Sequence, residues 1–182
     1  MPEKKDENKK ERVAIFIDGS NLYHSLDGVK IDFEKLIKEL TKDRILTNAF
    51  YYISPLDIAS NVEKYWKHQK FLAELEKIPG FKVVLCTLRK HKNKDGTFGF
   101  DVKGDDVYLA NDMLVGAYEN LYDDAILVSG DEDFVPVMNT LKRLNKKTEN
   151  AFFTKTSSKK LRKICDKATN LSIILDKIKL EK

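Results

Sequence analysis

Apolar residues along this chain follow two alternating patterns. Five short runs are rich in β-branched and aromatic residues and end at turn-forming residues, which is the pattern of buried strands. These strands are predicted over residues 12–18, 45–54, 81–90, 124–129 and, more weakly, 148–153. In the segments between them apolar residues recur every three to four positions, which predicts helices. The helices are predicted over residues 32–40, 58–78, 105–120 and 134–144, and residues 157–178 are expected to be helical or a helix-turn-helix.

The order of these elements indicates the fold class. An Asp-Gly pair within residues 94–100 is a turn signal, so residues 85–102 are expected to contain a hairpin. Elsewhere strands alternate with helices, which indicates a parallel sheet covered on both faces. We therefore predict an α/β fold in three α/β/α layers, with a central, mostly parallel sheet of about five strands. In such sheets ligands bind beyond the carboxyl ends of the strands, near the point where the strand order reverses.

Composition limits the class of protein. The chain has 182 residues, 42% hydrophobic and 34% charged, as expected for a soluble globular protein. Residues 1–11 are expected to form a disordered charged tail, and residues 12–178 a single domain. No apolar run reaches the roughly 20 residues of a membrane span, and the N-terminal segment lacks the apolar core of a secretory signal. Cys86 and Cys165 are far apart in sequence, so we interpret both as reduced thiols in a cytoplasmic protein.

Charge is distributed unevenly along the chain. The net charge is +4, but residues 142–182 hold 13 Lys and Arg against 4 Asp and Glu, a net +9. The remaining residues hold 20 against 25, a net −5. A basic part joined to an acidic part suggests a polyanion-binding surface beside an acidic site. The solvated face of a Lys-rich C-terminal helix would explain the basic part equally well.

Acidic side chains follow two of the predicted strands. The stretch ILVSGDEDF places Asp131, Glu132 and Asp133 directly after a buried run, and Asp18 closes the first strand. Carboxylates this close repel one another and lose hydration in a concave site, so a bound cation would relieve the cost. Each acid also has a structural alternative as a turn residue or a helix cap. Those alternatives do not explain why the acids share one edge of one sheet.

A third candidate lies at the start of the predicted helix 105–120. Asp106 falls on the apolar stripe of this helix, which contains Ala110, Met113 and Ala117. At 100° per residue its carboxylate is expected to point inward. Asp105 and Asp112 are expected about 100–120° to one side, where they reach the site less directly.

Motifs of several other enzyme classes are missing from the sequence. There is no G-x-x-x-x-G-K-[ST] loop, no G-x-G-x-x-G after the first strand, no Asp-x-Asp pair at its end and no G-x-S-x-G elbow. A cluster of bare carboxylates suits hard cations with oxygen ligands, such as Mg²⁺ or Mn²⁺. The commonest chemistry of such a site is hydrolysis of a phosphate ester.

Three blocks of the sequence, FIDGSNLY (16–23), KGDDVYLANDML (103–114) and VSGDEDFVP (128–136), resemble the NYN domain. Their order and spacing are similar to the LabA-like branch of that family, within the PIN-like nuclease superfamily, over roughly residues 12–170. The resemblance implies a Rossmann-like (PIN-like) α/β/α fold and a metal-dependent endoribonuclease that acts on RNA. The rival interpretations are a non-catalytic RNA- or protein-binding regulatory module and a small-molecule phosphohydrolase.

The resemblance also implies roles for individual residues. Asp18, Asp106 and Asp131 correspond to metal-binding acids of a catalytic site for Mg²⁺ or Mn²⁺, and Asp133 is the fourth acid. Asn21 corresponds to a polar residue beside the first acid that orients water or phosphate. Asp112 and Ser129 are expected to support these residues from behind, Ser129 through a hydrogen bond to a carboxylate.

Basic residues are expected to hold the RNA, which we predict to be single-stranded, because an acidic site alone repels a phosphate backbone. The candidates flank the predicted hairpin or end the helix after the acidic loop. They are Arg89, Lys90, Lys92, Lys94, Lys103, Lys142 and Arg143. No membrane partner is expected, and a homodimer is compatible with the sequence.

Overall fold

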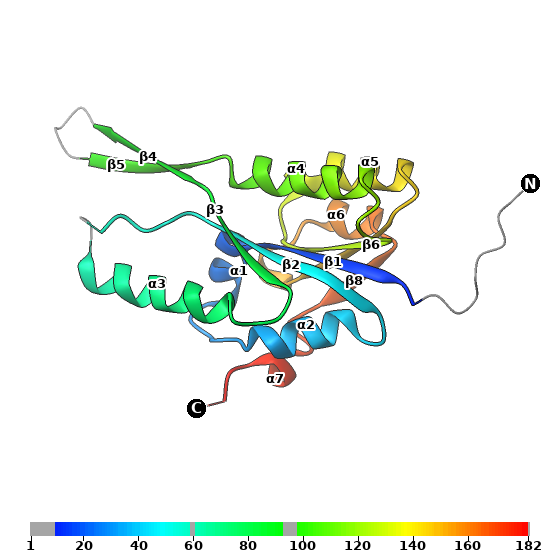
Figure 1. The fold of residues 1–182 in the computed structure, drawn as a ribbon, viewed down its shortest axis with the longest axis horizontal. Coiled ribbons are helices and arrows are strands. Elements are labelled where there is room, and N and C mark those ends of the chain that lie inside the picture. The colour runs from blue at the N-terminus through cyan, green and yellow to red at the C-terminus, as the bar shows by residue number, and fades with distance from the viewer. Residues whose placement is uncertain (1–9, 59–60, 93–97, 182) are drawn as a thin grey trace, which may run out of the picture.

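A computed structural model describes residues 10–58, 61–92 and 98–181, with the backbone alone for 88–92 and 98–103. Its centre is a six-stranded parallel sheet in the order β3-β2-β1-β6-β7-β8 (Figure 1). The strands are β1 (Arg12–Asp18), β2 (Ile45–Ile53), β3 (Phe81–Leu85), β6 (Asp124–Val128), β7 (Lys147–Phe152) and β8 (Lys167–Asn170). The chain builds outward from β1 to β3 and then returns to the other side of β1 with β6. The strand order therefore reverses between β1 and β6, which is where ligands bind in open α/β sheets.

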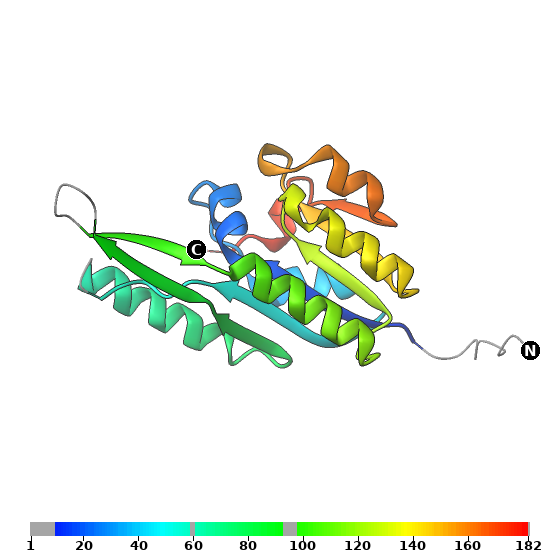
Figure 2. The same cartoon turned by 90° about the horizontal axis from the view of Figure 1, so that it is seen from above.

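Helices cover both faces of the sheet, as Figures 1 and 2 show, which confirms the predicted α/β/α layers. One layer consists of α1 (Gly19–Leu26), α2 (Phe33–Thr41), α3 (Val62–Leu75) and α7 (Leu175–Ile178). The other consists of α4 (Asp105–Tyr118), α5 (Val135–Arg143) and α6 (Lys159–Ile164). Along β1, Val13, Ile15 and Ile17 pack into the first core, while Ala14 and Phe16 pack into the second. This central strand is buried on both sides, which explains its nearly continuous apolar sequence.

The predicted hairpin is present and projects from the sheet as an arm (Figure 2). Strands β4 (Thr87–Lys92) and β5 (Phe98–Lys103) pair antiparallel, from Thr87 opposite Lys103 to Lys92 opposite Phe98. The expected single strand 81–90 is broken at Cys86, whose side chain is buried in the core. The Asp-Gly turn and the expected charged tail fall largely on residues 93–97 and 1–9, outside the described residues.

Two local predictions were wrong. The segment 157–178 was expected to be helical or a helix-turn-helix, but α6 ends at Ile164 and residues 167–170 form β8, a sixth strand beside β7. Asp166 fixes this change, because its carboxylate accepts hydrogen bonds from the backbone N–H and hydroxyl of Thr148, both at 2.9 Å. The Asp-Gly-Ser-Asn segment after β1 was expected to be a turn, but it starts helix α1. In the described chain, no helix combines the length and apolar character needed to cross a membrane.

Candidate active site

The site is built where the carboxyl ends of β1 and β6 lie side by side. Ile17 of β1 pairs with Val128 of β6, so the residues that follow each strand emerge at the same edge. Asp18 follows on one side and Ser129, Gly130 and Asp131 follow on the other. The sheet therefore brings together acids that are more than a hundred residues apart in sequence.

Asp18 is the most buried acid at this edge, with 7% of its surface exposed. One carboxylate oxygen accepts from the backbone N–H of Asn21 at 2.9 Å and thereby caps α1. The other accepts from the Ser129 hydroxyl at 2.9 Å. The Ser129 hydroxyl oxygen in turn accepts from the backbone N–H of Asp131 at 3.1 Å. Ser129 thus links the two acid-bearing strand ends and holds the Asp18 carboxylate in one orientation.

Asn21 has a positioning role in this arrangement. Its side-chain oxygen accepts from the backbone N–H of Gly130 at 3.0 Å, which ties α1 to the loop after β6. Gly130 packs closely against the segment between β7 and α6. A Cβ at Gly130 would lie 2.2 Å from the Thr156 carbonyl oxygen in that segment. Only glycine fits at this point of the acidic loop.

The acids of the loop after β6 have different surroundings. Asp131 is half-buried and caps the 3-10 helix η1 (Glu132–Phe134), accepting from the backbone N–H of Asp133 at 2.9 Å. The sequence had suggested Asp133 as the cap, but Asp133 is exposed. Glu132, to which no role was assigned, accepts from the Ser158 hydroxyl at 2.9 Å and pairs with Lys160 at 3.2 Å. It therefore fastens the acidic loop to the start of α6.

The prediction for the first turn of α4 needs a correction. The buried face of α4 consists of Leu109, Met113, Gly116 and Ala117. Asp105, one turn before Leu109, continues that face and is half-buried, whereas Asp106 is exposed. Met113 and Ala117 of the predicted stripe are buried, but Leu109 and not Ala110 continues it toward the start of the helix. In the structure Gly116 faces the core, because a Cβ there would lie 2.8 Å from the Tyr122 ring.

The acids of α4 are electrostatically coupled to the acids that follow β1 and β6. Burial raises the pKa of Asp18 above its ordinary value, and the charges of Asp105 and Asp131 raise it further. Although the Asp106 side chain is exposed, neighbouring protein partly desolvates its carboxylate and raises its pKa to about 6, and the charges of Asp105, Asp18, Asp131 and Asp133 raise it further. The two strand ends and the start of α4 thus form one cluster of mutually repelling carboxylates. Asp105, considered less directly placed from sequence, is a full member of it.

Asp112 lies further along α4 and supports the site indirectly. Its carboxylate accepts from the hydroxyl of Tyr52 at 2.9 Å, and Tyr52 is buried near the end of β2. Burial, followed by the Asp112 charge, raises the pKa of the Tyr52 hydroxyl, so this group stays protonated and donates. The bond fixes α4 on the sheet and with it the position of the helix start.

The donor set suits a hard cation, because the cluster consists of carboxylate oxygens. The Cys86 thiol lies near the acids of α4, but burial and their charges raise its pKa to about 11, so it stays protonated and is a poor ligand. Among the described residues, no three Asp, Glu, His or Cys side chains are already arranged as ligands of one ion. Both Asp18 oxygens and one Asp131 oxygen accept hydrogen bonds within the protein instead. The residues therefore fit a divalent metal by chemistry and charge, while the observed side-chain arrangement is not a finished coordination shell.

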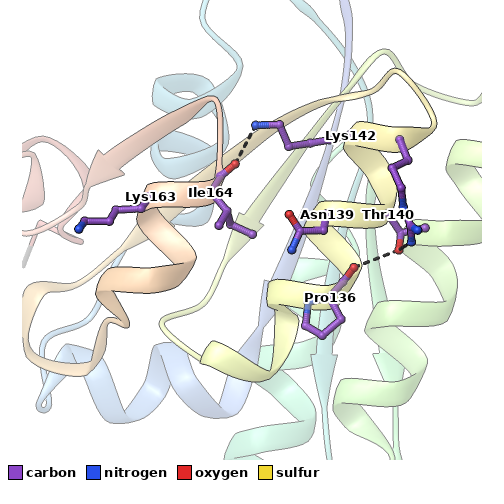
Figure 3. A pocket seen from close by; sticks show the side chains of 7 residues that line it. Pro136, Asn139, Thr140, Lys142, Lys163 and Ile164 are labelled. Atoms are coloured by element: carbon purple, nitrogen blue, oxygen red, sulfur yellow. Dashed lines mark hydrogen bonds between the residues drawn. The ribbon is translucent and has the colours of Figure 1, made fainter.

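The basic residues predicted to hold RNA fall into two regions. Arg89, Lys90 and Lys92 lie on β4 and Lys103 on β5, while Lys94 lies outside the described residues. Lys142 and Arg143 form the last turn of α5, at the opposite end of that helix from the acidic loop. Figure 3 shows Lys142 there. A nine-residue helix is about 13 Å long, so Lys142 and Arg143 do not directly flank the cluster.

The chain is similar to a known domain family and to a solved structure. The family model of the NYN domain matches residues 12–173. The crystal structure of a protein of unknown function from Vibrio parahaemolyticus RIMD 2210633 has a TM-score of 0.75 and 23% sequence identity. The match covers 97% of this chain and 100% of that chain, and at this identity it shows a shared fold alone. A search of curated proteins gave no match.

Proposed function

This chain belongs to the NYN domain family, whose members are generally PIN-like nucleases, and we propose that it is a metal-dependent endoribonuclease of the LabA-like branch. The observation that carries the proposal is the convergence of Asp18, Asp131 and the acids of α4 where the strand order reverses. The substrate would be single-stranded RNA, and the reaction would be hydrolysis of an internal phosphodiester bond.

The proposed metal ligands are Asp18, Asp106 and Asp131, with Mg²⁺ or Mn²⁺ as the ion. Bound there, such an ion would lower the pKa of a water molecule and neutralise charge on the phosphate. Asp105 lies in the same cluster and is a further candidate ligand, because its charge raises the pKa of both Asp18 and Asp106. Asp133 is exposed beside the cluster, where it can approach substrate or solvent.

Ser129 and Asn21 would act by positioning the acids. Ser129 holds one Asp18 oxygen and the Asp131 backbone in place, so it fixes the relative position of the two strand-end acids. Asn21 holds Gly130 and keeps the loop after β6 against α1. Pre-arranged groups of this kind lower the reorganisation needed when charge develops during reaction.

A non-catalytic RNA- or protein-binding module is the second candidate, and one observation favours it. The carboxylates accept hydrogen bonds within the protein and are not arranged as a three-ligand site in the described residues. A member that had lost metal binding would keep such contacts as structural bonds. The two functions differ in whether metal changes stability and supports cleavage.

The deciding experiment is cleavage of a circular single-stranded RNA, which has no ends and so reports endonuclease activity alone. We expect cleavage with Mg²⁺ or Mn²⁺, none with EDTA, and none by Asp18→Asn. Asp43→Asn is the matched control, since Asp43 is an exposed acid before β2, at the opposite edge of the sheet. Intact circles under all conditions, together with unchanged melting temperature on adding metal, would favour the binding module.

A further inference from the structure

An open groove of about 880 Å³ lies between α5 and α6 (Figure 3). Three of its lining side chains are cationic, Lys142, Arg143 and Lys163, and two are neutral and polar, Asn139 and Thr140. None of the lining residues carries a carboxylate. The groove is therefore an open, positively charged surface on a molecule whose proposed active site is acidic.

The groove begins at Pro136, in the first turn of α5, which directly follows η1 of the acidic loop. The backbone N–H of Ser158, the residue that caps α6, donates to the Gly130 carbonyl at 2.9 Å. Glu132 pairs with Lys160 in the first turn of α6. At the other end the Lys142 ammonium donates to the Ile164 carbonyl at 2.8 Å. The two helices thus run side by side in the same direction, and the groove follows α5 from its first turn, next to the acidic loop, to the far ends of both helices.

The cations of the groove differ in how free they are to bind a ligand. Lys142 pairs with Asp166 at 2.8 Å and holds the end of α6. Arg143 and Lys163 are exposed, and no carboxylate pairs with either of them among the described residues. The six residues of α6 include four Lys and Arg and no acid. Arg143 and Lys163 are therefore available to an anionic ligand.

We propose that the groove between α5 and α6 holds the phosphate backbone of the RNA strand as it leaves the acidic site. This inference rests on the proposed nuclease function, because an acidic cluster cannot retain a polyanion by itself. The length of α5, about 13 Å, accommodates roughly four nucleotides at the stacked spacing of about 3.4 Å. An open groove with cations on both walls contacts phosphates and leaves the bases unread, so binding does not depend on sequence.

The test is the affinity of a fluorescent single-stranded RNA, measured by anisotropy in Ca²⁺ at several salt concentrations. The groove variant is Arg143→Glu with Lys163→Glu. The control is Lys38→Glu with Lys177→Glu, which makes the same charge change at exposed sites on α2 and α7, on the other face of the sheet. Thermal melting of both proteins checks that each is folded.

We expect the groove variant to bind at least about tenfold more weakly than the control. Its slope of log affinity against log salt should be flatter by about 1.4, the value for two lost phosphate contacts on a single strand. Equal affinities of the two variants for RNA would overturn the inference. It would also be overturned if the groove variant bound polyglutamate, a polyanion without phosphates, more weakly but bound RNA as well as before. If wild type fails to cleave RNA while the groove variant still loses affinity, the nuclease proposal fails and the groove stands.

Discussion

At the scale of single residues, the site is a chain of contacts that holds like charges together. Asp18, Ser129 and Asp131 are joined by hydrogen bonds of 2.9 and 3.1 Å, although the acids repel. The repulsion contributes, after burial, to the raised pKa values of Asp18 and Asp106. Folding supplies the energy that keeps these carboxylates close, and a cation would recover part of it.

Replacing Asp131 by Asn should abolish metal-dependent cleavage, by about 100-fold or more, and leave the fold intact. Asn is as good a helix cap as Asp, so the bond to the Asp133 backbone is kept while one repelling charge is removed. The melting temperature in EDTA should therefore stay level or rise. A clear fall in that temperature with cleavage retained would mean that Asp131 serves only as a cap.

The pH dependence of stability should report on Asp106. Its pKa in the folded protein is about 6, above the ordinary value of 3.8, so the folded state takes up a proton before the unfolded state does. The Asp106 charge thus destabilises the fold above about pH 6, and this effect disappears as the pH falls below about 4.

In EDTA at pH 7.5, Asp106→Asn should raise the melting temperature by about 1–3 °C, a modest shift because the side chain is exposed and solvent screens it. At pH 4 the variant and wild type should melt together. Asp43→Asn controls for the loss of one negative charge. A shift that persists at pH 4 would assign the effect to something other than this carboxylate.

At the scale of elements, the acidic loop depends on its contact with the segment between β7 and α6. That segment contains the 3-10 helix η2 (Thr154–Thr156), which lies directly against Gly130. It is also tied to α1 by the 2.6 Å bond between the hydroxyls of Ser25 and Thr156. Three elements from distant parts of the sequence therefore fix the position of one loop.

Gly130→Ala should destabilise the protein by about 1–3 kcal/mol through overpacking, because the new methyl group meets backbone atoms of Thr156 and Ser157. The loop must move, so the rise in melting temperature on adding Mg²⁺ or Mn²⁺ should shrink as well. Gly28→Ala is the control, since Gly28 has positive φ but no atom lies within 4 Å of the place that a methyl group would take there. That variant should lose stability and keep the full metal effect.

At the scale of the whole molecule, a second charged cluster lies toward the amino ends of the strands, at the edge of the sheet opposite the candidate site. Arg44, just before β2, pairs with Asp124 at the start of β6 and with Glu149 of β7, the latter at 2.8 Å. Lys167 of β8 pairs with the other oxygen of Glu149 at 2.6 Å. Burial and the nearby Glu149 raise the pKa of Asp124 to about 7. For Glu149, burial acts to raise the pKa, but the hydrogen bonds from Lys167 and Arg44 outweigh it and lower the pKa. This cluster joins four segments of the sheet.

Arg44→Leu should destabilise the protein by about 3–5 kcal/mol at pH 7.5, because it leaves buried carboxylates without their shared partner. Without Arg44 the folded-state pKa values of these carboxylates rise, so the deficit relative to wild type should shrink at pH 5.5. Urea denaturation at both pH values measures this. The control is Arg12→Leu, which removes a partly exposed pair with Asp123 and should cost at most about 1 kcal/mol. Equal losses in the two variants would contradict a special role for the buried cluster.

Sequence alone determined the layers of the fold and the edge at which the acids meet. Apolar runs reveal buried strands and apolar spacing reveals helices, since both follow from local backbone geometry. That is why β1, β2, β6, α4 and α5 were predicted close to their observed bounds. Asp18 and Asp131 directly follow buried strands, so a parallel sheet had to place them at one edge.

Tertiary structure alone decided the features that depend on contacts between distant segments. Residues 167–170 became a strand because the free edge of β7 was there to pair with them, which no local pattern of the sequence indicates. Asp105 took the inward position on α4 because Gly116 faces the Tyr122 ring, and a glycine has no side chain to reveal its direction in a hydrophobic pattern. The direction of the groove between α5 and α6 likewise follows from the bonds that Gly130 and Glu132 make to the start of α6, across a separation of more than twenty residues.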